Sequence, residues 1–176
     1  MKFFKKAPET EKIVKSLQNN NDIYLVPAFT GLGAPYWDAN ARGVLSGITR
    51  DTSPKEIVRA TIEAVAYQTH DLFEAMKHDG LRPKIVKVDG GMVMNNWFSQ
   101  FLSDIVNVKV LRPKVQETTA LGAAFMAGLY IGIYKSLKDI SKNWNLDKKF
   151  SPKMKNKSRT ILINGWEKAV KRALIN

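Results

Sequence analysis

Short apolar runs alternate along the chain with longer segments in which apolar residues recur every three or four positions. The apolar runs are rich in β-branched residues and are bounded by Gly, Pro, Asn or Asp, which is typical of strands. They comprise residues 23–26, 42–49, 85–89 and 108–111. The helical pattern fills segments that begin near residues 53, 95 and 118. Strands alternating with helices predict an α/β layered fold whose strands pair at least partly in parallel.

The segment from Ser53 carries the strongest helix start. Ser53 can cap the first turn, Pro54 suits the first helical position, and Glu56 completes a capping box. We expect this helix to run to about Lys77 and to stop near Gly80. The helical period places one set of residues on a common face: Ile57, Thr61, Ala64, Val65, Gln68, Leu72 and Met76.

Two histidines, His70 and His78, lie within this helix or just after it. They are eight positions apart, and no pattern of partner residues accompanies them. We therefore expect them to be packing or surface residues, and we predict no metal site.

The stretch from Ile85 to Asn95 joins a β-branched run to a glycine pair and then to a new amphipathic segment. Gly90 and Gly91 have no Cβ, so the backbone can approach a flat or charged ligand closely. Asn95 is a good helix N-cap, and the first N–H groups of a helix can face an anion or a polar ring. This arrangement is common where a nucleotide is held, although a tight turn alone would also account for the glycines.

The loop at residues 28–38 mixes small residues with Phe29, Tyr36 and Trp37. Surface loops seldom carry three large aromatic side chains together. Either the loop folds back onto its own core, or it forms one wall of a cleft.

The longest uncharged stretch covers residues 118–134 and is 17 residues long. It contains several glycines and is at the lower limit for a membrane span, so we expect a buried helix and no membrane span. Glycine costs roughly 1 kcal/mol relative to alanine in a helix, and close approach of another helix or strand is the usual compensation. A Gly128-x-x-x-Gly132 spacing lies at its end, where we favour soluble close packing over a membrane dimer.

The two ends of the chain differ from its centre. Residues 1–22 form a helix-leaning lead that ends in an Asn- and Asp-rich turn, and residues 135–176 form a basic, extended tail with a short helix from Trp166 to Ile175. The tail has twelve Lys or Arg and three acids, or +9 of the net +12. No compact aromatic and basic pattern accompanies this charge, so no nucleic acid is expected as a partner. Cysteine is absent and residues 1–6 do not form a secretory signal, which fits a cytoplasmic protein.

Five blocks in order resemble the C-terminal domain of the FGGY family of carbohydrate kinases, and within it the glycerol kinases. Residues 43–48 with 56–63 fit the C-terminal signature of that family, and residues 26–38 resemble its glycerol-kinase form. The other similar blocks are residues 88–91 with Asn95, residues 117–124 and residues 165–170. The resemblance extends from about Asn21 to Ala173. Between the lead segment and the basic tail, residues 23–134 are the expected nucleotide-binding domain.

The resemblance implies a partial actin-like fold of the ribonuclease-H type, shared with sugar kinases and Hsp70, in which helices flank a mixed sheet. It also implies ATP or ADP in a cleft between two such domains, with Mg²⁺ in the complete enzyme. Gly91 and Asn95 match family positions that contact adenosine, and Gly90 belongs to the same turn. The helix from Thr118 matches one packed tightly near the interdomain hinge.

The resemblance also indicates what a kinase would need in addition. The family's N-terminal domain brings an Asp-x-Gly-Thr phosphate loop, the glycerol-binding residues and a catalytic aspartate, and neither that motif nor a Gly-Thr-Gly turn occurs here. Asp89 is no substitute base, so no catalytic residue is predicted. We expect phosphorylation of glycerol only with an N-terminal kinase half, which is the expected partner beside a homo-oligomer. The alternative is a non-catalytic interaction module.

Overall fold

The computed structural model describes residue 4 and residues 6–174. Its strands are β1 (Tyr24–Val26), β2 (Val44–Ser46), β3 (Ile85–Lys87), β4 (Lys109–Pro113) and β5 (Leu146–Phe150). Its helices are α1 (Glu9–Lys15), α2 (Pro54–His78), α3 (Asn96–Val106), α4 (Thr118–Tyr130), α5 (Leu137–Ser141) and α6 (Asn156–Leu174), with a 3-10 helix η1 (Gly91–Met94) before α3.

The strands form two sheets. β3, β4 and β5 follow one another in the larger sheet, where β3 is parallel to β4 and β5 is antiparallel to β4. The parallel pair is joined through α3, as a parallel pair requires a crossover. β1 and β2 form an antiparallel pair in which Tyr24 lies opposite Ser46. The predicted α/β class, a mixed sheet with flanking helices, is confirmed.

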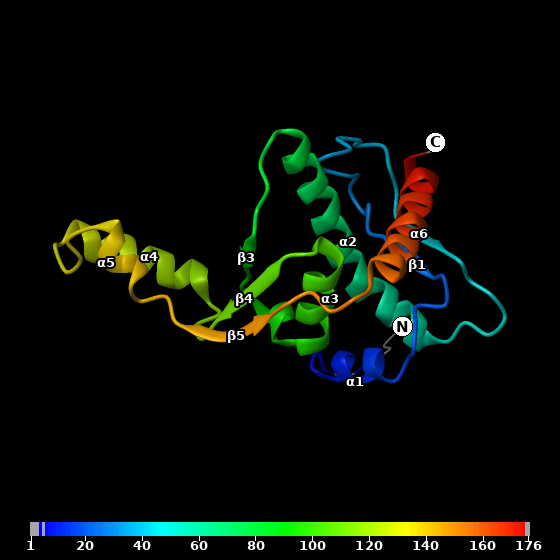
Figure 1. The fold of residues 1–176 in the computed structure, drawn as a ribbon, viewed down its shortest axis with the longest axis horizontal. Coiled ribbons are helices and arrows are strands. Elements are labelled where there is room, and N and C mark those ends of the chain that lie inside the picture. Colours follow the sequence, from blue (N-terminus) through cyan, green and yellow to red (C-terminus); the bar gives the residue numbers. More distant parts are fainter. Residues whose placement is uncertain (1–3, 5, 175–176) are drawn as a thin grey trace.

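α2 crosses the centre of the fold (Figure 1). Its start is the predicted one: Ser53 and Glu56 form a capping box, Pro54 opens the helix, and the helix ends at His78 before Gly80. The residues expected on one common face are not the buried ones, because they are mostly half-buried or exposed and only Ala64 among them is buried. α2 packs against α1, α3 and β1 together, so its buried arc is wide and includes Val58, Ile62 and Tyr67 with polar residues between them.

Tyr67 of α2 lies at the centre of the core. Its ring centroid is 5.8 Å from that of Tyr24, 5.7 Å from that of Phe101 and 5.3 Å from that of Trp166. These rings come from β1, α3 and α6, so one aromatic cluster joins elements far apart in the sequence.

The C-terminal segment is more structured than an extended tail. β5 pairs with β4, and α6 begins at Asn156, ten residues before the predicted helix start. Trp166, Ala169 and Val170 are buried in the core, while the basic residues of this segment lie on the outer face. Val14 of the lead segment joins the same core, and the division at residues 22 and 134 stays a prediction.

α4 and α5 project from the body of the molecule as an arm (Figure 1). The expectation of a buried helix is wrong: of the α4 residues only Gly128 is buried, and Tyr130 is 92% exposed. The close approach at Gly128 comes from the following turn, since a Cβ there would lie 2.8 Å from the Tyr134 ring. No other described element covers the arm. Among the described residues, no helix is both long and apolar enough to cross a bilayer.

Candidate functional site

The turn after β3 has the predicted strand–glycine–helix geometry. Gly90 has a φ of +85°, which favours glycine, and Gly91 opens η1. Asn95 then caps α3, because its side-chain oxygen accepts a hydrogen bond from the Phe98 N–H at 3.0 Å.

This turn forms one wall of a cavity of about 640 Å³. The structure brings Gly91 and Asn95 to the cavity, whereas Gly90 is not among its lining residues. The other walls come from α1 with the segment before it and from the first turns of α2. The lining consists of Phe4, Ala7, Pro8, Thr10, Glu11, Ile57, Val58, Thr61, Ile62, Gly91, Met92, Met94 and Asn95.

The cavity is largely apolar, and a small set of polar groups lies at one end. Phe4, Ala7 and Pro8 together with the isoleucine, valine and methionine side chains supply most of the lining, and the described lining residues include no Lys or Arg. Ligand sites of this size are usually apolar with a few polar groups that fix orientation. The cavity therefore suits a flat, mostly apolar ring system.

The polar end of the cavity is held by contacts between α1 and the start of α3. Glu11 accepts a hydrogen bond from the Asn96 N–H at 3.2 Å, and the Asn95 amide donates to Thr10 Oγ1 at 3.5 Å. Burial would raise the pKa of Glu11, but Lys15 and the Asn96 N–H outweigh it and hold that pKa below its ordinary value.

The start of α3 is consequently not a free anion site. Two of its N–H groups already donate, one to Glu11 and one to Asn95, and the Glu11 carboxylate stands beside them. A phosphate placed here would meet a negative charge, so the expectation of unpaired N–H groups at this helix end is wrong.

Arg112 of β4 holds the turn at residues 90–95 in place through side-chain hydrogen bonds, and the sequence analysis did not predict this role. Its guanidinium donates to the carbonyls of Val93 at 2.8 Å and Met94 at 3.3 Å, to Asn96 Oδ1 at 3.3 Å and to Asp147 at 2.7 Å. Arg112 is buried near the end of β4. In the sequence this position follows an apolar run and precedes a proline, which indicates the end of a strand but not a buried hydrogen-bond donor.

The lead segment also supplies walls that the sequence reading missed. Ala7 and Pro8 precede α1, and Thr10 and Glu11 lie on it. They reach the cavity because α1 packs against both α2 and α3. The sequence of this segment is only weakly amphipathic, through Ile13, Val14 and Leu17. Such a pattern indicates that a helix packs against the core, and it gives no sign of a ligand.

Asp89 lies beside the turn but faces α4. Its carboxylate accepts a hydrogen bond from the Thr118 hydroxyl at the start of that helix. The Gly90 N–H donates to the Gln116 carbonyl at 3.2 Å, which fixes the approach to α4. Glu117, the residue before α4, makes no side-chain capping hydrogen bond to that helix.

The aromatic loop at residues 28–38 does not line this cavity. Leu32 is buried, and the Tyr36 hydroxyl donates to Asp71 at 2.8 Å, so part of the loop folds back onto the core. Phe29 and Trp37 are 74% and 79% exposed on its outer side. The loop thus combines an anchored inner side with an outward aromatic side.

The two histidines are separated in the structure. His70 is mostly buried, with its Nδ1 3.6 Å from an Asp71 oxygen, and His78 is exposed at the end of α2. Within residue 4 and residues 6–174, no group of three or more His, Asp or Glu side chains is placed to hold a metal ion.

A family model described as the C-terminal domain of the FGGY family of carbohydrate kinases matches residues 4–130. Glycerol kinase 1 of Pseudomonas aeruginosa is 53% identical over 172 residues, and a glycerol kinase of Clostridium botulinum is 50% identical over 175. These alignments cover 98% and 99% of this chain. They cover 35% of either relative, so the chain spans about a third of the length of the curated relatives it matches.

Solved structures agree with this result. The crystal structure of Plasmodium falciparum glycerol kinase with ADP superposes with a TM-score of 0.86 at 37% identity, over 99% of this chain and 35% of that one. A ligand-bound xylulose kinase from Lactobacillus acidophilus gives a TM-score of 0.76 at 24% identity, over 98% of this chain and 35% of the other, and shows the fold alone.

Proposed function

Because this chain belongs to the FGGY family of carbohydrate kinases, through their C-terminal domain, we propose that it is the nucleotide-binding part of a glycerol kinase. In this proposal the cavity beside Gly91 and Asn95 holds the adenosine of ATP or ADP. Phosphoryl transfer to glycerol then requires a complementary N-terminal half, and Mg²⁺ acts only in the complete enzyme.

The observation that carries the proposal is the apolar cavity beside Gly91. It has the volume of a small-molecule site, and its lining is apolar except for a few polar groups near Asn95. An adenine ring is flat and can donate and accept hydrogen bonds at its edge, which matches this combination. A solved relative of similar fold is described as holding ADP.

The charges around the cavity support a proposal in which this chain binds the nucleoside and the other half binds the phosphates. No Lys or Arg lines the cavity among residue 4 and residues 6–174, and the Glu11 carboxylate stands at the start of α3. Transfer of a phosphoryl group relies on positive charge and positioning around the phosphates. These charges support a proposal in which the cavity holds the nucleoside and the phosphate-binding groups belong to the other half.

Nucleotide binding is tested by calorimetry on the full chain with ATP and ADP. Gly91→Leu places a side chain at the cavity wall. A Cβ at this position would have no other atom within 4 Å, so the leucine fits the fold and projects from the wall. We expect the variant to fold normally and to lose affinity by about tenfold or more, roughly 1.4 kcal/mol. Gly122→Ala on α4 is the matched control, because its Cβ also meets open space and Gly122 lies outside the cavity. Equal affinity in Gly91→Leu and the unaltered chain would contradict the assignment.

Catalysis is tested by reconstitution. The chain is mixed with the part of the Pseudomonas aeruginosa relative that it does not match, and ATP-dependent phosphorylation of glycerol is measured. We expect activity in the mixture and none in either polypeptide alone. If the chain binds ATP but the mixture stays inactive, the split-enzyme proposal fails while the nucleotide site stands.

A second candidate function is a non-catalytic interaction module, and the exposed α4 arm favours it. Tyr130, Ile131 and Ile133 are more than half exposed on a helix end without charged residues. Exposed apolar patches of this kind mark interaction surfaces. A chain that binds no ATP but associates through this arm would favour this function, since a kinase half should bind nucleotide.

A further inference from the structure

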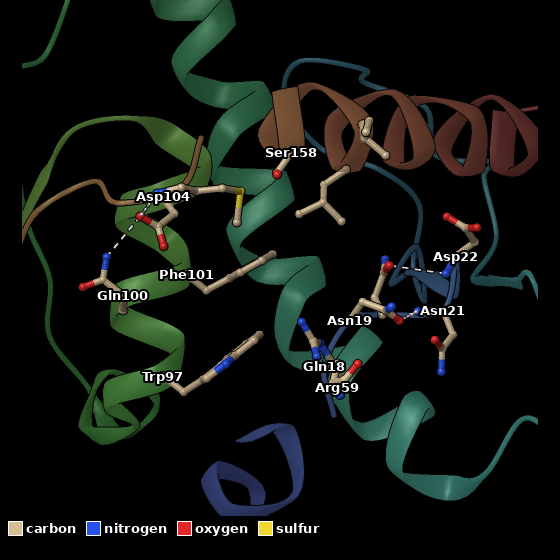
Figure 2. A pocket seen from close by; sticks show the side chains of 14 residues that line it. Gln18, Asn19, Asn21, Asp22, Arg59, Trp97, Gln100, Phe101, Asp104 and Ser158 are labelled. Atoms are coloured by element: carbon tan, nitrogen blue, oxygen red, sulfur yellow. Dashed lines mark hydrogen bonds between the residues drawn. The ribbon is translucent and has the colours of Figure 1, made fainter. Parts of the chain in front are cut away.

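A second cavity of about 640 Å³ shares no lining residue with the one beside Gly91. It lies between the turn at residues 18–22, α3 and the start of α6, with α2 behind it (Figure 2). Trp97 and Phe101 of α3 point into it from one side, and Asn19 and Asn21 of the turn line the opposite side (Figure 2). The function proposed above makes no use of this space.

Asp104 brings an unpaired acceptor to the cavity. This residue is 8% exposed, and its Oδ1 accepts from the backbone N–H of Lys153 at 2.6 Å, from that of Met154 at 3.1 Å and from the Gln100 amide at 3.1 Å. Its Oδ2 has no hydrogen-bond partner among the described residues. Because Oδ2 is not among the buried atoms without a partner, it is open to a donor from a ligand or water in the cavity.

Arg59 brings an unpaired donor to the same cavity. It is also 8% exposed, and its Nε donates to Glu63 at 2.7 Å and its Nη1 to the Leu17 carbonyl at 2.8 Å. Its Nη2 has no partner in the part of the chain that the structure describes. The guanidinium lies over the Trp97 ring, 5.1 Å from the centroid, and is fixed in place by these contacts.

The turn at residues 18–22 adds the Asn19 side-chain amide. Asn19 Oδ1 accepts from the Asn21 N–H at 2.9 Å, which leaves its Nδ2 without a described partner. Asn21 and Asp22 hold left-handed backbone conformations, with φ of 50° and 57°, so the turn has a defined shape. Asp104 of α3, Arg59 of α2 and Asn19 of the turn thus line one cavity from three elements.

We propose that this cavity binds a neutral polyhydroxylated molecule, a sugar or polyol. A hydroxyl group both donates and accepts, so it satisfies the Asp104 oxygen and the Arg59 and Asn19 donors alike. Arg59 is already paired with Glu63, and Asp22 and Asp104 disfavour an anion. The apolar lining from Phe101, Met154, Ile161 and Leu162 suits the C–H faces of such a molecule.

The test is titration of the ¹⁵N-labelled full chain with glucose and, separately, sorbitol, followed by NMR. We expect saturable shifts at the Trp97 indole and Asn19 amide, with none at Asn95. Asp104→Asn keeps the Oδ1 acceptor and turns Oδ2 into a donor, and Asn19→Asp keeps its own acceptor and removes the donor. Each should weaken binding by about tenfold or more. Asp51→Asn and Asn164→Asp make the same chemical changes at exposed positions outside the cavity and should leave affinity unchanged.

Several outcomes overturn the proposal. Shifts that rise linearly to the solubility limit, or that are equal in all variants, indicate a general solvent effect of the additive rather than a site. Saturable binding of succinate or putrescine in place of the two neutral probes overturns the assignment of a neutral ligand. Should Asp104→Asn fail to fold, Asn19→Asp in the surface turn decides the matter alone.

Discussion

At the scale of single residues, Ser53 and Glu56 show how local chemistry sets a helix start. The Glu56 carboxylate accepts from the Ser53 N–H at 3.0 Å and from its hydroxyl at 2.5 Å. The hydrogen bond from Ser53 holds the pKa of Glu56 below its ordinary value near 4.5. The capping box therefore depends on the ionised carboxylate.

Glu56→Gln tests this dependence on pH. The pKa of Glu56 is lowered in the folded state, so its contribution is present above pH 4.5 and is lost as pH falls through the folded-state value. Glutamine still caps but binds no proton. As pH falls through this range, we expect the free energy of unfolding of the unaltered chain to drop by about 1 kcal/mol more than that of the variant. Urea unfolding of both proteins at a series of pH values measures the difference. Parallel pH profiles would contradict the prediction.

Arg112 makes a residue-scale prediction for the candidate nucleotide site. Arg112→Lys keeps the positive charge, but an ammonium cannot reach all four acceptors of the guanidinium fork. We expect a loss of about 1–3 kcal/mol in unfolding free energy, because buried acceptors lose their donor. Nucleotide affinity should fall as well, since the Val93 and Met94 carbonyls set the shape of η1.

Calorimetry at a temperature where the Arg112→Lys variant remains folded separates these two effects. Lys114→Arg, at an exposed position just after β4, is the control for a basic substitution in the same region. An Arg112→Lys variant with full stability and full nucleotide affinity would show that the guanidinium contacts do not position the turn.

At the scale of elements, α6 packs on β1 through Gly165. A Cβ at this position would lie 2.2 Å from the Tyr24 hydroxyl oxygen, and that hydroxyl is buried without a hydrogen-bond partner. Gly165→Ala should therefore push α6 away from β1 and destabilise the chain by about 1–3 kcal/mol, although alanine is the better helix former. Thermal and urea unfolding measure the change.

Gly122→Ala is the helical control for this prediction, because open space surrounds Gly122 on α4. It should be neutral or slightly stabilising, by about 1 kcal/mol at most. If both alanine variants behave alike, helix propensity rather than packing controls the Gly165 position.

At the scale of the whole molecule, the α4–α5 arm leaves a large apolar surface in solvent. Met126, Tyr130, Ile131, Ile133 and Leu137 are all more than half exposed. Such a surface favours a partner or self-association. We expect the chain alone to associate at micromolar concentration, as measured by sedimentation velocity.

The variant Met126→Glu with Ile133→Lys should reduce that association without lowering the free energy of unfolding, because neither side chain is buried. In the reconstitution described above, the same variant should bind the N-terminal half less well. A monomeric unaltered chain, with the double variant unchanged in reconstitution, would show that the arm is not an interaction surface.

The candidate site was predictable where its features are local. The φ of Gly90 and the Asn95 cap depend on residues within one turn, and both were predicted. The α1 wall and the brace from Arg112 were not, because they depend on contacts between segments separated along the chain. The contact with α1 also occupies the N–H group of Asn96, so of the two ligands expected at this helix start, an anion or a polar ring, the anion is disfavoured.

For the fold, the sequence by itself determined the order of β1–β4 and α2–α4, the capping box at Ser53 and the α/β class, because periodicity and capping act over a few residues. Only the tertiary structure decided which face of α2 is buried, how far α6 extends and that α4 is exposed. Apolar composition shows that a segment can be buried, but burial needs a second surface to cover it. α2 and α6 find that surface within the chain around Tyr67, and α4 does not find one within the described residues.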